Sequence, residues 1–524
     1  MAAARAAFGG LAPAPRPARA LGPRVGAGSP ALGPPPARCR SRSRSLRRGA
    51  RPVAPPRAVA STPGTPPSPA PSAVAWPDGS GRAEAPSSLG GVLVAEARVS
   101  NLGARGVIAT GLPFLDHMID QLTSHCQLGV SVVVSDSSDG APKREPCVDA
   151  SGEDDEAVAR AAGAALGAAL RELLAPGVAA AAAAAAGEVA AVFSAPLDEA
   201  YCECAIALGE VGTPPSFHFD LAPFGPKGTP GRTLIGTYKT AVTRPFWEAL
   251  ASEAPFASLS LRKRRGDNAH HIVEATFKSF ARCLRAVMDE VEGVDVVRDA
   301  AARAAASSTD RSRRTASRSR STKETTIAAS LDVDGDASAS TVRTGLATLD
   351  ELLLAIATEG GVRLEVDAEG DLWIDDHHTT EDVAITVGQV LAEALGDKAG
   401  CNRMGSAIAR TADGAATVEV VMDLSNRPYL DNGLEFEGEF VGDLSAEMID
   451  HMFMSVATNA QMTAHIAMTK TKTDPGEGGA ETTLDEEALA RCAAEAFGKC
   501  LAQCVAVDPR RAGAVASSKG TLSV

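Results

Sequence analysis

Two adjacent histidines followed by a glutamate occur twice in the chain, as HHIVE at 270–274 and HHTTE at 377–381. On a helix, the first histidine and the glutamate lie one turn apart on a common face, so both side chains can reach a single metal ion. The second histidine points about 100° away round the helix and cannot comfortably share that ion. Each motif therefore predicts ligands for two different ions.

Two further histidines stand in similar surroundings, His117 in FLDHM and His451 in IDHMF. Two adjacent histidines without other ligands nearby would more readily form a solvated polar patch than a metal site. Two HHxxE motifs together with two DHM histidines favour metal coordination. His218 and His465 have no such context, and their default interpretation is structural or exposed.

Hydrophobic periodicity places these motifs on helices. Apolar residues recur at helical spacing after both DHM and HHxxE, at Leu115, Met118, Ile119 and Leu122, and at Val273, Phe277, Phe280, Leu284 and Val287. The segments 130–135, 362–368 and 416–424 alternate or are rich in β-branched residues, which predicts strands. The expected class is α+β, with sheets covered on one face by helices.

The chain repeats itself. TGLPFLDHMIDQL at 110–122 returns as TGLATLDELLLAI at 344–356, and FARCL at 280–284 returns as FGKCL at 497–501. A drifting offset between the repeats indicates two copies of one domain with different loop lengths. We place copy one at 90–298, a Ser/Arg-rich linker at 299–322 and copy two at 323–524. DHM occurs in the first half of copy one and in the second half of copy two, and HHxxE occurs in the second half of copy one and in the first half of copy two. Each copy therefore also consists of two similar halves.

The N-terminal segment differs in composition from the rest. Residues 1–77 contain twelve Arg and no Asp or Glu, so their removal would change the formal charge from −14 to −26. Arg- and Ser-rich, acid-free composition is typical of an organelle transit peptide, and the Pro and Ser content favours a plastid over a mitochondrion. We expect residues 1–85 to be a disordered presequence. The acidic remainder argues against nucleic acid or a membrane as a partner.

The ordered set of motifs resembles one enzyme family. FLDHM, DDHHTTED, SNRPYL, GDLSAEMIDH, HHIVEATFKSF and the terminal SSKG are similar to motifs of imidazoleglycerol-phosphate dehydratases. The resemblance implies two-layer halves related to a ribosomal-protein S5 domain, a large homo-oligomer, and a small phosphate-bearing substrate. It also implies a two-manganese site. The ligands that it implies are His117, His270, His271, Glu274, His377, His378, Glu381 and His451.

The two copies have lost complementary parts of this ligand set. Copy one has Gly152 to Glu156 in place of the first HHxxE and Pro245 in place of the EMIxH histidine. Copy two has Glu351 in place of the DHM histidine and Glu487 to Arg491 in place of the second HHxxE. The random decay of a redundant copy would more often erase one copy and spare the other. Complementary loss is expected when a site takes ligands from both partners.

The resemblance also implies substrate-binding and catalytic residues. Arg403, Arg427, Ser517, Ser518 and Lys519 match phosphate contacts of the family, and His125 lies in a substrate-contact stretch. Arginine, lysine and hydroxyl groups supply charge-assisted donors that suit a phosphate monoester. Glu324 in TKETT matches an acidic residue that shuttles a proton, and Glu96 is taken as its counterpart in copy one.

Two functions fit these observations. One is an active dehydratase of histidine biosynthesis with two Mn²⁺ at a site that both copies form. The other is a catalytically inactive, metal-binding assembly protein of the same descent. Retention of the phosphate-binding residues favours the enzyme, because a scaffold needs no grip on phosphate. Three imidazoles and one carboxylate suit manganese, iron or zinc, so the residues alone leave the metal open.

Overall fold

The computed structural model describes residues 75–87, 91–136, 153–183, 189–209, 214–297, 299, 313–470, 484–511 and 513–522. The chain divides into two compact units, Met1–Ser68 and Pro69–Val524. All described residues belong to the second unit. Most of the expected presequence lies outside the described residues.

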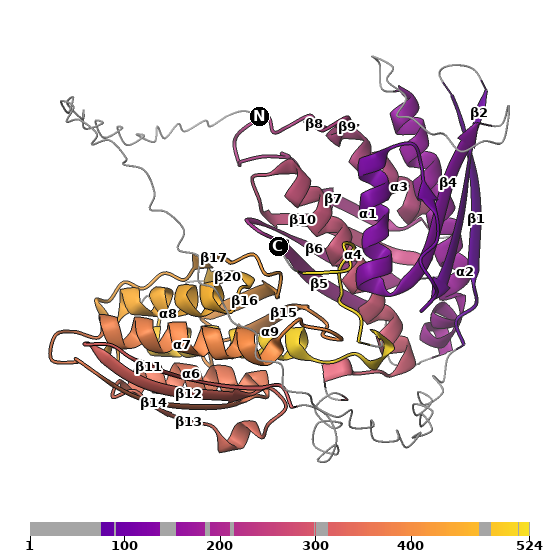
Figure 1. Cartoon of the computed structure of the whole chain (residues 1–524). Helices are drawn as coiled ribbons and strands as arrows, with labels where there is room; N and C mark the ends of the chain where they lie inside the picture. The colour runs from indigo at the N-terminus through magenta and orange to yellow at the C-terminus, as the bar shows by residue number, and fades with distance from the viewer. Residues whose placement is uncertain are drawn as a thin grey trace, which may run out of the picture. The chain divides into compact units, whose positions relative to one another are not determined.

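Copy one contains two halves with the same order of elements (Figure 1). The first half comprises β1 (Gly79–Pro86), β2 (Val92–Asn101), β3 (Ile108–Ala109), α1 (Pro113–Gln121), η1 (Leu122–Cys126), β4 (Leu128–Asp136) and α2 (Glu153–Ala183). The second comprises β5 (Ala190–Leu197), β6 (Ala200–Leu208), β7 (Ser216–Asp220), the short β8 (Leu234–Ile235) and β9 (Tyr238–Lys239), η2 (Thr240–Val242), α3 (Thr243–Glu253), β10 (Phe256–Arg265) and α4 (Ala269–Glu292).

Copy two repeats both halves. Its first half comprises β11 (Thr315–Ser321), β12 (Thr325–Asp332), η3 (Ala337–Ala339), β13 (Thr341–Arg343), α6 (Ala347–Gly360), β14 (Arg363–Gly370) and α7 (His377–Leu395). The second comprises β15 (Met404–Arg410), β16 (Ala416–Asp423), β17 (Tyr429–Gly433), β18 (Phe440–Val441), β19 (Leu444–Ser445), α8 (Ala446–Asn459), β20 (Thr463–Lys470), α9 (Glu486–Val505) and η4 (Pro509–Arg511).

Each half forms one four-stranded sheet, and the four strand orders are equivalent: β1-β2-β4-β3, β5-β6-β10-β7, β11-β12-β14-β13 and β15-β16-β20-β17. In every sheet the first three strands in this order pair antiparallel, and the last pairs parallel to its neighbour. The predicted α+β class, the tandem copies and the internal halves are therefore confirmed.

Helices of the two halves pack together inside each copy. In copy two, α6 to α9 lie between the sheet of β11–β14 and the sheet of β15–β17 and β20 (Figure 1). One apolar core runs through both halves, because Leu349 on α6 and Phe497 on α9 belong to the same buried cluster. Burial of these apolar faces stabilises the contact between the halves, which positions the helix starts that carry the histidines.

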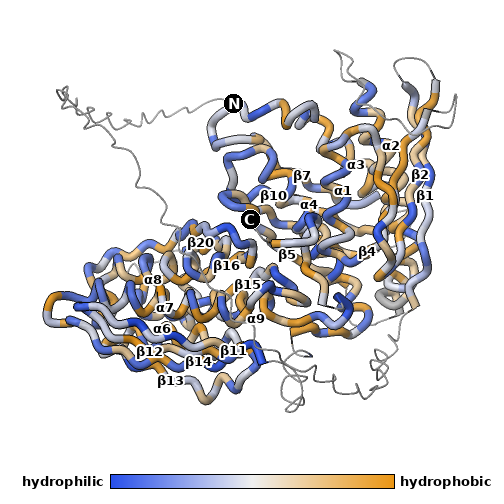
Figure 2. The backbone as a smooth tube through the Cα atoms, in the orientation of Figure 1, coloured by the Kyte–Doolittle hydropathy of each residue, from blue (hydrophilic) through white to orange (hydrophobic). Residues whose placement is uncertain are grey.

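The first strand of each copy lies outside the boundaries expected from the sequence. All of β1 except Pro86 falls within the segment 1–85 assigned to the presequence, and β11 falls within the linker 299–322. Both are edge strands with little apolar alternation, and Figure 2 colours β11 as largely hydrophilic. Gly79 of β1 lies so close to α2 that a Cβ would come within 1.9 Å of the Ala169 carbonyl oxygen. A strand that packs this closely through glycine has no large apolar side chains, so its sequence lacks the alternating pattern that predicts a strand.

None of the helices in the described part of the chain combines the length and apolar character that a membrane crossing requires.

Candidate functional site

The first group of candidate ligands joins the two halves of copy one. His117 lies on α1, and His270 and Glu274 lie on α4. The Glu274 Oε2 atom is 3.1 Å from His270 Nε2 and 3.7 Å from His117 Nε2. Asn268 caps α4 by accepting a hydrogen bond from the His270 backbone N–H, which fixes the helix start that carries these ligands.

A buried lysine supports the carboxylate of this group. The Lys278 ammonium lies 2.8 Å from Glu274 Oε1, one helical turn beyond it, and is buried. Burial alone would raise the pKa of Glu274, but Lys278 and hydrogen bonds with His117 and His270 hold it well below its ordinary value. Glu274 is therefore an anion. Sequence analysis missed Lys278, although its place in HHIVEATFK, four residues after Glu274, was a usable signal.

The second group joins the two halves of copy two. His377 and Glu381 lie on α7, and His451 lies on α8. Glu381 approaches both imidazoles, with 3.8 Å between Oε2 and His377 Nε2 and 3.3 Å between Oε1 and His451 Nε2. The two imidazole ring centroids are 5.1 Å apart.

Two contacts bring α7 and α8 together at these histidines. Asp376, just before α7, accepts hydrogen bonds from the backbone N–H and hydroxyl of Ser445, just before α8. Further along α7, Gly388 lies so close to α8 that a Cβ there would be 2.8 Å from the Val456 carbonyl oxygen. Asp376 thus holds the starts of two ligand-bearing helices rather than orienting one imidazole.

Both groups fit a divalent cation. In each, one ligand atom from every side chain lies within 4.8 Å of the others. Neighbouring ligands of an ion bound at about 2.1 Å are separated by about 3.0–3.5 Å, so only small movements would close either group round an ion. Two imidazoles and one carboxylate are a donor set for Mn²⁺, Fe²⁺ or Zn²⁺, and they leave coordination positions open.

The two histidines of each HHxxE motif have different surroundings in the structure. His271 and His378 belong to neither of the two groups that the described residues form. Each instead turns Nδ1 towards a carboxylate: His271 Nδ1 is 2.6 Å from Glu199 Oε2, and His378 Nδ1 is 3.1 Å from Asp371 Oδ2. The hydrogen bond with Asp371 raises the pKa of His378. In both histidines the carboxylate contacts Nδ1, which leaves Nε2 as the other ring nitrogen.

Ion pairs stand at or beside the positions where each copy has lost its ligands. In copy two, Glu351 and Arg491 stand where copy one has His117 and Glu274, and Arg491 Nη1 is 2.7 Å from Glu351 Oε1. In copy one, Arg160 joins Glu156 on α2 to Glu248 on α3, at 2.9 and 3.3 Å. Glu156 is therefore paired with arginine in the structure.

Two aspartates next to ligands have local partners. Asp116 accepts hydrogen bonds from the Thr110 backbone and hydroxyl, and Asp350 in copy two does the same with Thr344. Asp450, which precedes His451, accepts from Asn432. Because copy two keeps the Asp350 contact without a histidine beside it, the Asp116 contact shapes the entry to α1 and needs no metal.

The predicted phosphate-binding residue Arg427 lies at the contact between the copies. Its Nε donates to the Asp198 carboxylate of copy one at 2.6 Å, whereas its Nη2 is buried and has no hydrogen-bond partner among the described residues. Arg427 thus retains a free donor. Ser517 and Ser518 are half-buried and Lys519 is exposed, and the Lys519 backbone N–H donates to the Ser517 hydroxyl.

Arg403 is buried and already paired. Its guanidinium makes two hydrogen bonds to Asp423, at 2.6 and 2.7 Å, and donates to the Ala516 carbonyl at 2.6 Å. Its backbone adopts a φ of 72°, in the left-handed region that non-glycine residues rarely enter. In this arrangement Arg403 holds the segment that carries Ser517 to Lys519.

His125 lies in the π-helical turn η1, for which copy two has regular α-helix. The side chain is buried, and its Nδ1 has no hydrogen-bond partner in the described structure. Burial lowers the pKa of His125 well below its ordinary value, and the nearby charges of Arg403, Lys278, Arg511 and Arg282 lower it further. His125 of copy one and Arg403 of copy two therefore belong to one buried basic cluster.

The two candidate proton shuttles differ in position. Glu324 is exposed in the turn between β11 and β12, close enough to His378 to raise the pKa of that imidazole. Thr325, which follows it, donates to Asp382 on α7 at 2.6 Å, so the turn is tied to the ligand helix. Glu96 is exposed on β2.

The prediction that Glu96 is the counterpart of Glu324 is wrong. Thr325 pairs with Gly370 at the end of β14, and Leu93 pairs with Asp136 at the corresponding end of β4. Glu324 therefore corresponds to Val92. The β-branched and alternating residues of β2 and β12 look alike in several registers, so the sequence could not fix this one.

The remaining histidines differ from each other. His218 is exposed on β7, as expected. His465 on β20 is fully buried, and its Nε2 donates to the Asp198 backbone carbonyl of copy one at 2.8 Å. Burial lowers the pKa of His465 to about 4, so it is neutral.

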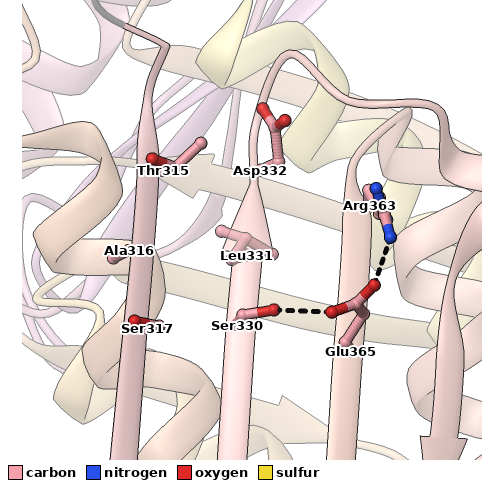
Figure 3. A pocket seen from close by; sticks show the side chains of 8 residues that line it. All are labelled: Thr315, Ala316, Ser317, Ser330, Leu331, Asp332, Arg363 and Glu365. Carbon is pink, nitrogen blue, oxygen red and sulfur yellow. Dashed lines mark hydrogen bonds and ion pairs between the residues drawn. The ribbon is translucent and has the colours of Figure 1, made fainter.

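A shallow hollow on the outside of the sheet of copy two contains none of the candidate ligands. It lies over β11, β12 and β14, where Ser330 and Arg363 both contact Glu365 (Figure 3). The candidate chemistry lies instead at the helix starts.

Comparison with known proteins agrees with this arrangement. The family model for imidazoleglycerol-phosphate dehydratase matches residues 110–284 and again 344–501. The imidazoleglycerol-phosphate dehydratase of Gloeobacter violaceus is 40% identical over 209 residues, which are 40% of this chain and 98% of the relative. That of Microcystis aeruginosa is 39% identical over 209 residues, 40% of this chain and 93% of the relative.

One solved structure is the imidazoleglycerol-phosphate dehydratase of Staphylococcus aureus, which is 27% identical, with a TM-score of 0.31, over 37% of this chain and 99% of that one. The family match is the stronger finding, because it occurs once in each copy and together spans more than half of the residues. The chain belongs to the imidazoleglycerol-phosphate dehydratase family.

Proposed function

We propose that the protein dehydrates D-erythro-imidazoleglycerol phosphate to imidazole acetol phosphate in histidine biosynthesis, at sites that need both copies. One observation carries this proposal. Among the described residues, each copy keeps one group of two histidines and a glutamate. An ion pair with arginine replaces the other group in copy two, and in copy one it involves the surviving Glu156. Within the described part of the chain, neither copy alone therefore retains two metal-binding groups.

The fourth ligand of each ion is assigned to a histidine from another copy. His271 is offered by copy one and His378 by copy two, and both already have a carboxylate on Nδ1. A carboxylate on one imidazole nitrogen is the usual support for metal binding through the other. A homo-oligomer would bring these histidines to the groups of neighbouring copies.

Bound Mn²⁺ would supply Lewis acidity that holds the substrate imidazole and stabilises its deprotonated form. The side chains of the chain perform the other tasks. Arg427, Ser517 and Lys519 would bind the phosphate, and Arg403 would hold the segment that carries the last two. Glu324 is the candidate to carry the proton between carbon and the leaving hydroxyl, because it is exposed beside His378.

We further propose that the mature enzyme acts in plastids. Support comes from the acid-free Arg- and Ser-rich N-terminal composition. Residues 1–77 fused to a fluorescent reporter should direct it to plastids, and the mature protein should lack Met1. Import into mitochondria, or retention of Met1 on the purified protein, would contradict this assignment.

The activity is tested with the purified full chain, Mn²⁺ and the authentic phosphate ester. We expect formation of imidazole acetol phosphate, loss of activity on chelation, and recovery when Mn²⁺ is returned. The Arg427→Met variant should raise the KM, because one guanidinium no longer reaches the phosphate. A chain that binds metal and folds but does not turn over the substrate would favour the assembly-protein alternative.

A further inference from the structure

The hairpin turn between β5 and β6 touches both candidate sites at once. Its two residues, Asp198 and Glu199, were not singled out by any motif. Asp198 adopts a φ of 49°, the left-handed conformation that two-residue hairpin turns use and that aspartate tolerates. Contacts from both copies surround this turn.

Glu199 connects the turn to the ligand helix of its own copy. One carboxylate oxygen accepts a hydrogen bond from the Asn268 backbone N–H at 2.9 Å, just before α4. The other lies 2.6 Å from His271 Nδ1. Glu199 therefore ties the hairpin turn both to the start of α4 and to the imidazole of His271.

Asp198 connects the same turn to copy two. Its carboxylate accepts the Arg427 Nε–H at 2.6 Å, and its backbone carbonyl accepts the His465 Nε2–H at 2.8 Å. The same carboxylate lies 4.0 Å from His271 Nε2. One turn therefore connects the candidate metal ligand of copy one with the candidate phosphate ligand of copy two.

The equivalent hairpin of copy two provides the contrast. Its turn between β15 and β16 carries Asp413, which is exposed and hydrogen-bonds only with Thr411 and Ala415 of the same turn among the contacts that the structure describes. A carboxylate in this turn does not by itself create the arrangement. The acidic pair contacts a metal ligand and an arginine only where copy one faces copy two.

We propose that Glu199 and Asp198 are positioning residues that couple the two halves of the reaction site across the copies. Glu199 fixes the His271 ring with Nε2 presented to an ion, and Asp198 holds Arg427 by Nε so that its Nη donors face the substrate phosphate. The inference rests on the proposed function and adds residues that act through His271 and Arg427. The position of His271 relative to Arg427, and so of the metal relative to the substrate phosphate, thus depends on one turn.

Metal binding tests the role of Glu199 without any turnover. Mn²⁺ is titrated into the metal-free full chain, with calorimetry and electron paramagnetic resonance as readouts. Glu199→Gln should weaken one class of bound Mn²⁺ about 10–100-fold, as loss of a carboxylate behind a ligating histidine does elsewhere. His271→Ala should weaken the same class, and the double variant should equal His271→Ala alone.

Further weakening in the double variant, or an unchanged titration for Glu199→Gln, would overturn the positioning role of Glu199. Asp413→Asn should titrate like the unaltered chain. A chain that binds Mn²⁺ normally yet fails to dehydrate the substrate would sink the proposed function while leaving this readout intact.

Inorganic phosphate tests the role of Asp198. Asp198→Asn should weaken phosphate binding about tenfold, the effect of one charge-assisted hydrogen bond, and leave Mn²⁺ binding to the His377 group unchanged. Asp413→Asn again serves as the matched control. Unchanged or tighter phosphate binding would show that Asp198 competes with the anion and does not orient Arg427.

Discussion

Glu274 and Glu381 each approach two imidazoles that come from different helices. A carboxylate in this position neutralises part of the charge of an ion and also links the two halves of its copy. Because the two groups lie in different copies and share no residue, they should lose their ions independently. Substitution of one ligand in either group should therefore remove one ion and leave the other bound, and the metal content per chain measures this.

His270→Ala and His377→Ala should each lower the metal content of the purified chain from about two ions to about one, because each removes a ligand from one group. Both should abolish activity if the two ions act together. Inductively coupled plasma mass spectrometry measures the ions per chain. His218→Ala, on an exposed strand, is the control and should retain both ions. Loss of both ions from either variant would show that the groups are coupled.

Much of this residue-level arrangement was predictable. Helical spacing placed His270 with Glu274 and excluded His271, and the structure has both features. The carboxylate partners of the excluded histidines were not predictable, since Glu199 lies 72 positions before His271 along the chain. A contact of that separation depends on strand pairing and leaves no local pattern.

At the scale of elements, small residues decide how closely ligand helices approach. Gly388 on α7 and Gly163 on α2 occupy corresponding positions in the two copies. A Cβ at Gly388 would lie 2.7 Å from Asn459 Cβ, and one at Gly163 would lie 2.2 Å from the Phe246 carbonyl oxygen. Both helix pairs are therefore packed at backbone distance, but only α7 and α8 carry a metal-binding group.

Gly388→Ala should lower the free energy of unfolding by about 1–3 kcal/mol, because α7 and α8 must separate to admit the methyl group. The same movement should draw His451 away from Glu381 and weaken Mn²⁺ binding. Chemical denaturation and metal titration measure the two effects. Gly163→Ala is the matched control, with similar destabilisation but unchanged metal affinity. Equal metal loss in both variants would mean that helix spacing does not set the ligand geometry.

The elements themselves divide into those with a strong pattern and those without one. β4, β14, β16 and the helices after DHM and HHxxE were predicted because their apolar residues are periodic and buried. The edge strands β1 and β11 were missed because they are polar, and the π-helical turn around His125 was missed because its sequence reads as ordinary helix. The error over Glu96 was one of strand register.

At the scale of the whole molecule, a second set of contacts joins the copies away from the metal groups. Arg510 of copy two binds Asp289 of copy one at 2.6 Å and Asp508 of its own copy at 2.9 Å. Gln127 of copy one donates to Asp508 at 2.7 Å. Burial alone would raise the pKa of Asp508, but Arg510 and Gln127 lower it to about 2.

This depressed pKa predicts the direction of a pH effect. The stabilisation from Asp508 is fully present above the unfolded pKa of about 3.9 and is lost as pH falls through the folded value of about 2. Its size is about 2 kcal/mol. Denaturation curves at several pH values should show that Asp508→Asn is less stable than the unaltered chain at pH 6, with the difference shrinking between pH 4 and 2. A constant difference over that range would rule out the linkage.

Separate expression of the copies tests their mutual dependence. Fragments 75–299 and 313–524, which include the edge strands β1 and β11, should each be inactive, since each has one metal-binding group. Mixed at equal stoichiometry with Mn²⁺, they should recover activity, because the linker only raises the effective concentration. Turnover by the isolated second fragment would show that one copy suffices. Folded fragments that bind each other without turnover would favour the assembly-protein alternative.

The Glu351–Arg491 ion pair prevents any single substitution from restoring the lost metal-binding group of copy two. Restoring a histidine at Glu351 alone would break the pair and leave the Arg491 cation where an ion would have to bind. Restoring the carboxylate at Arg491 alone would bring like charges together. Copy two regains its lost group only when Glu351, Glu487 and Arg491 change together. No single substitution therefore restores this group to copy two.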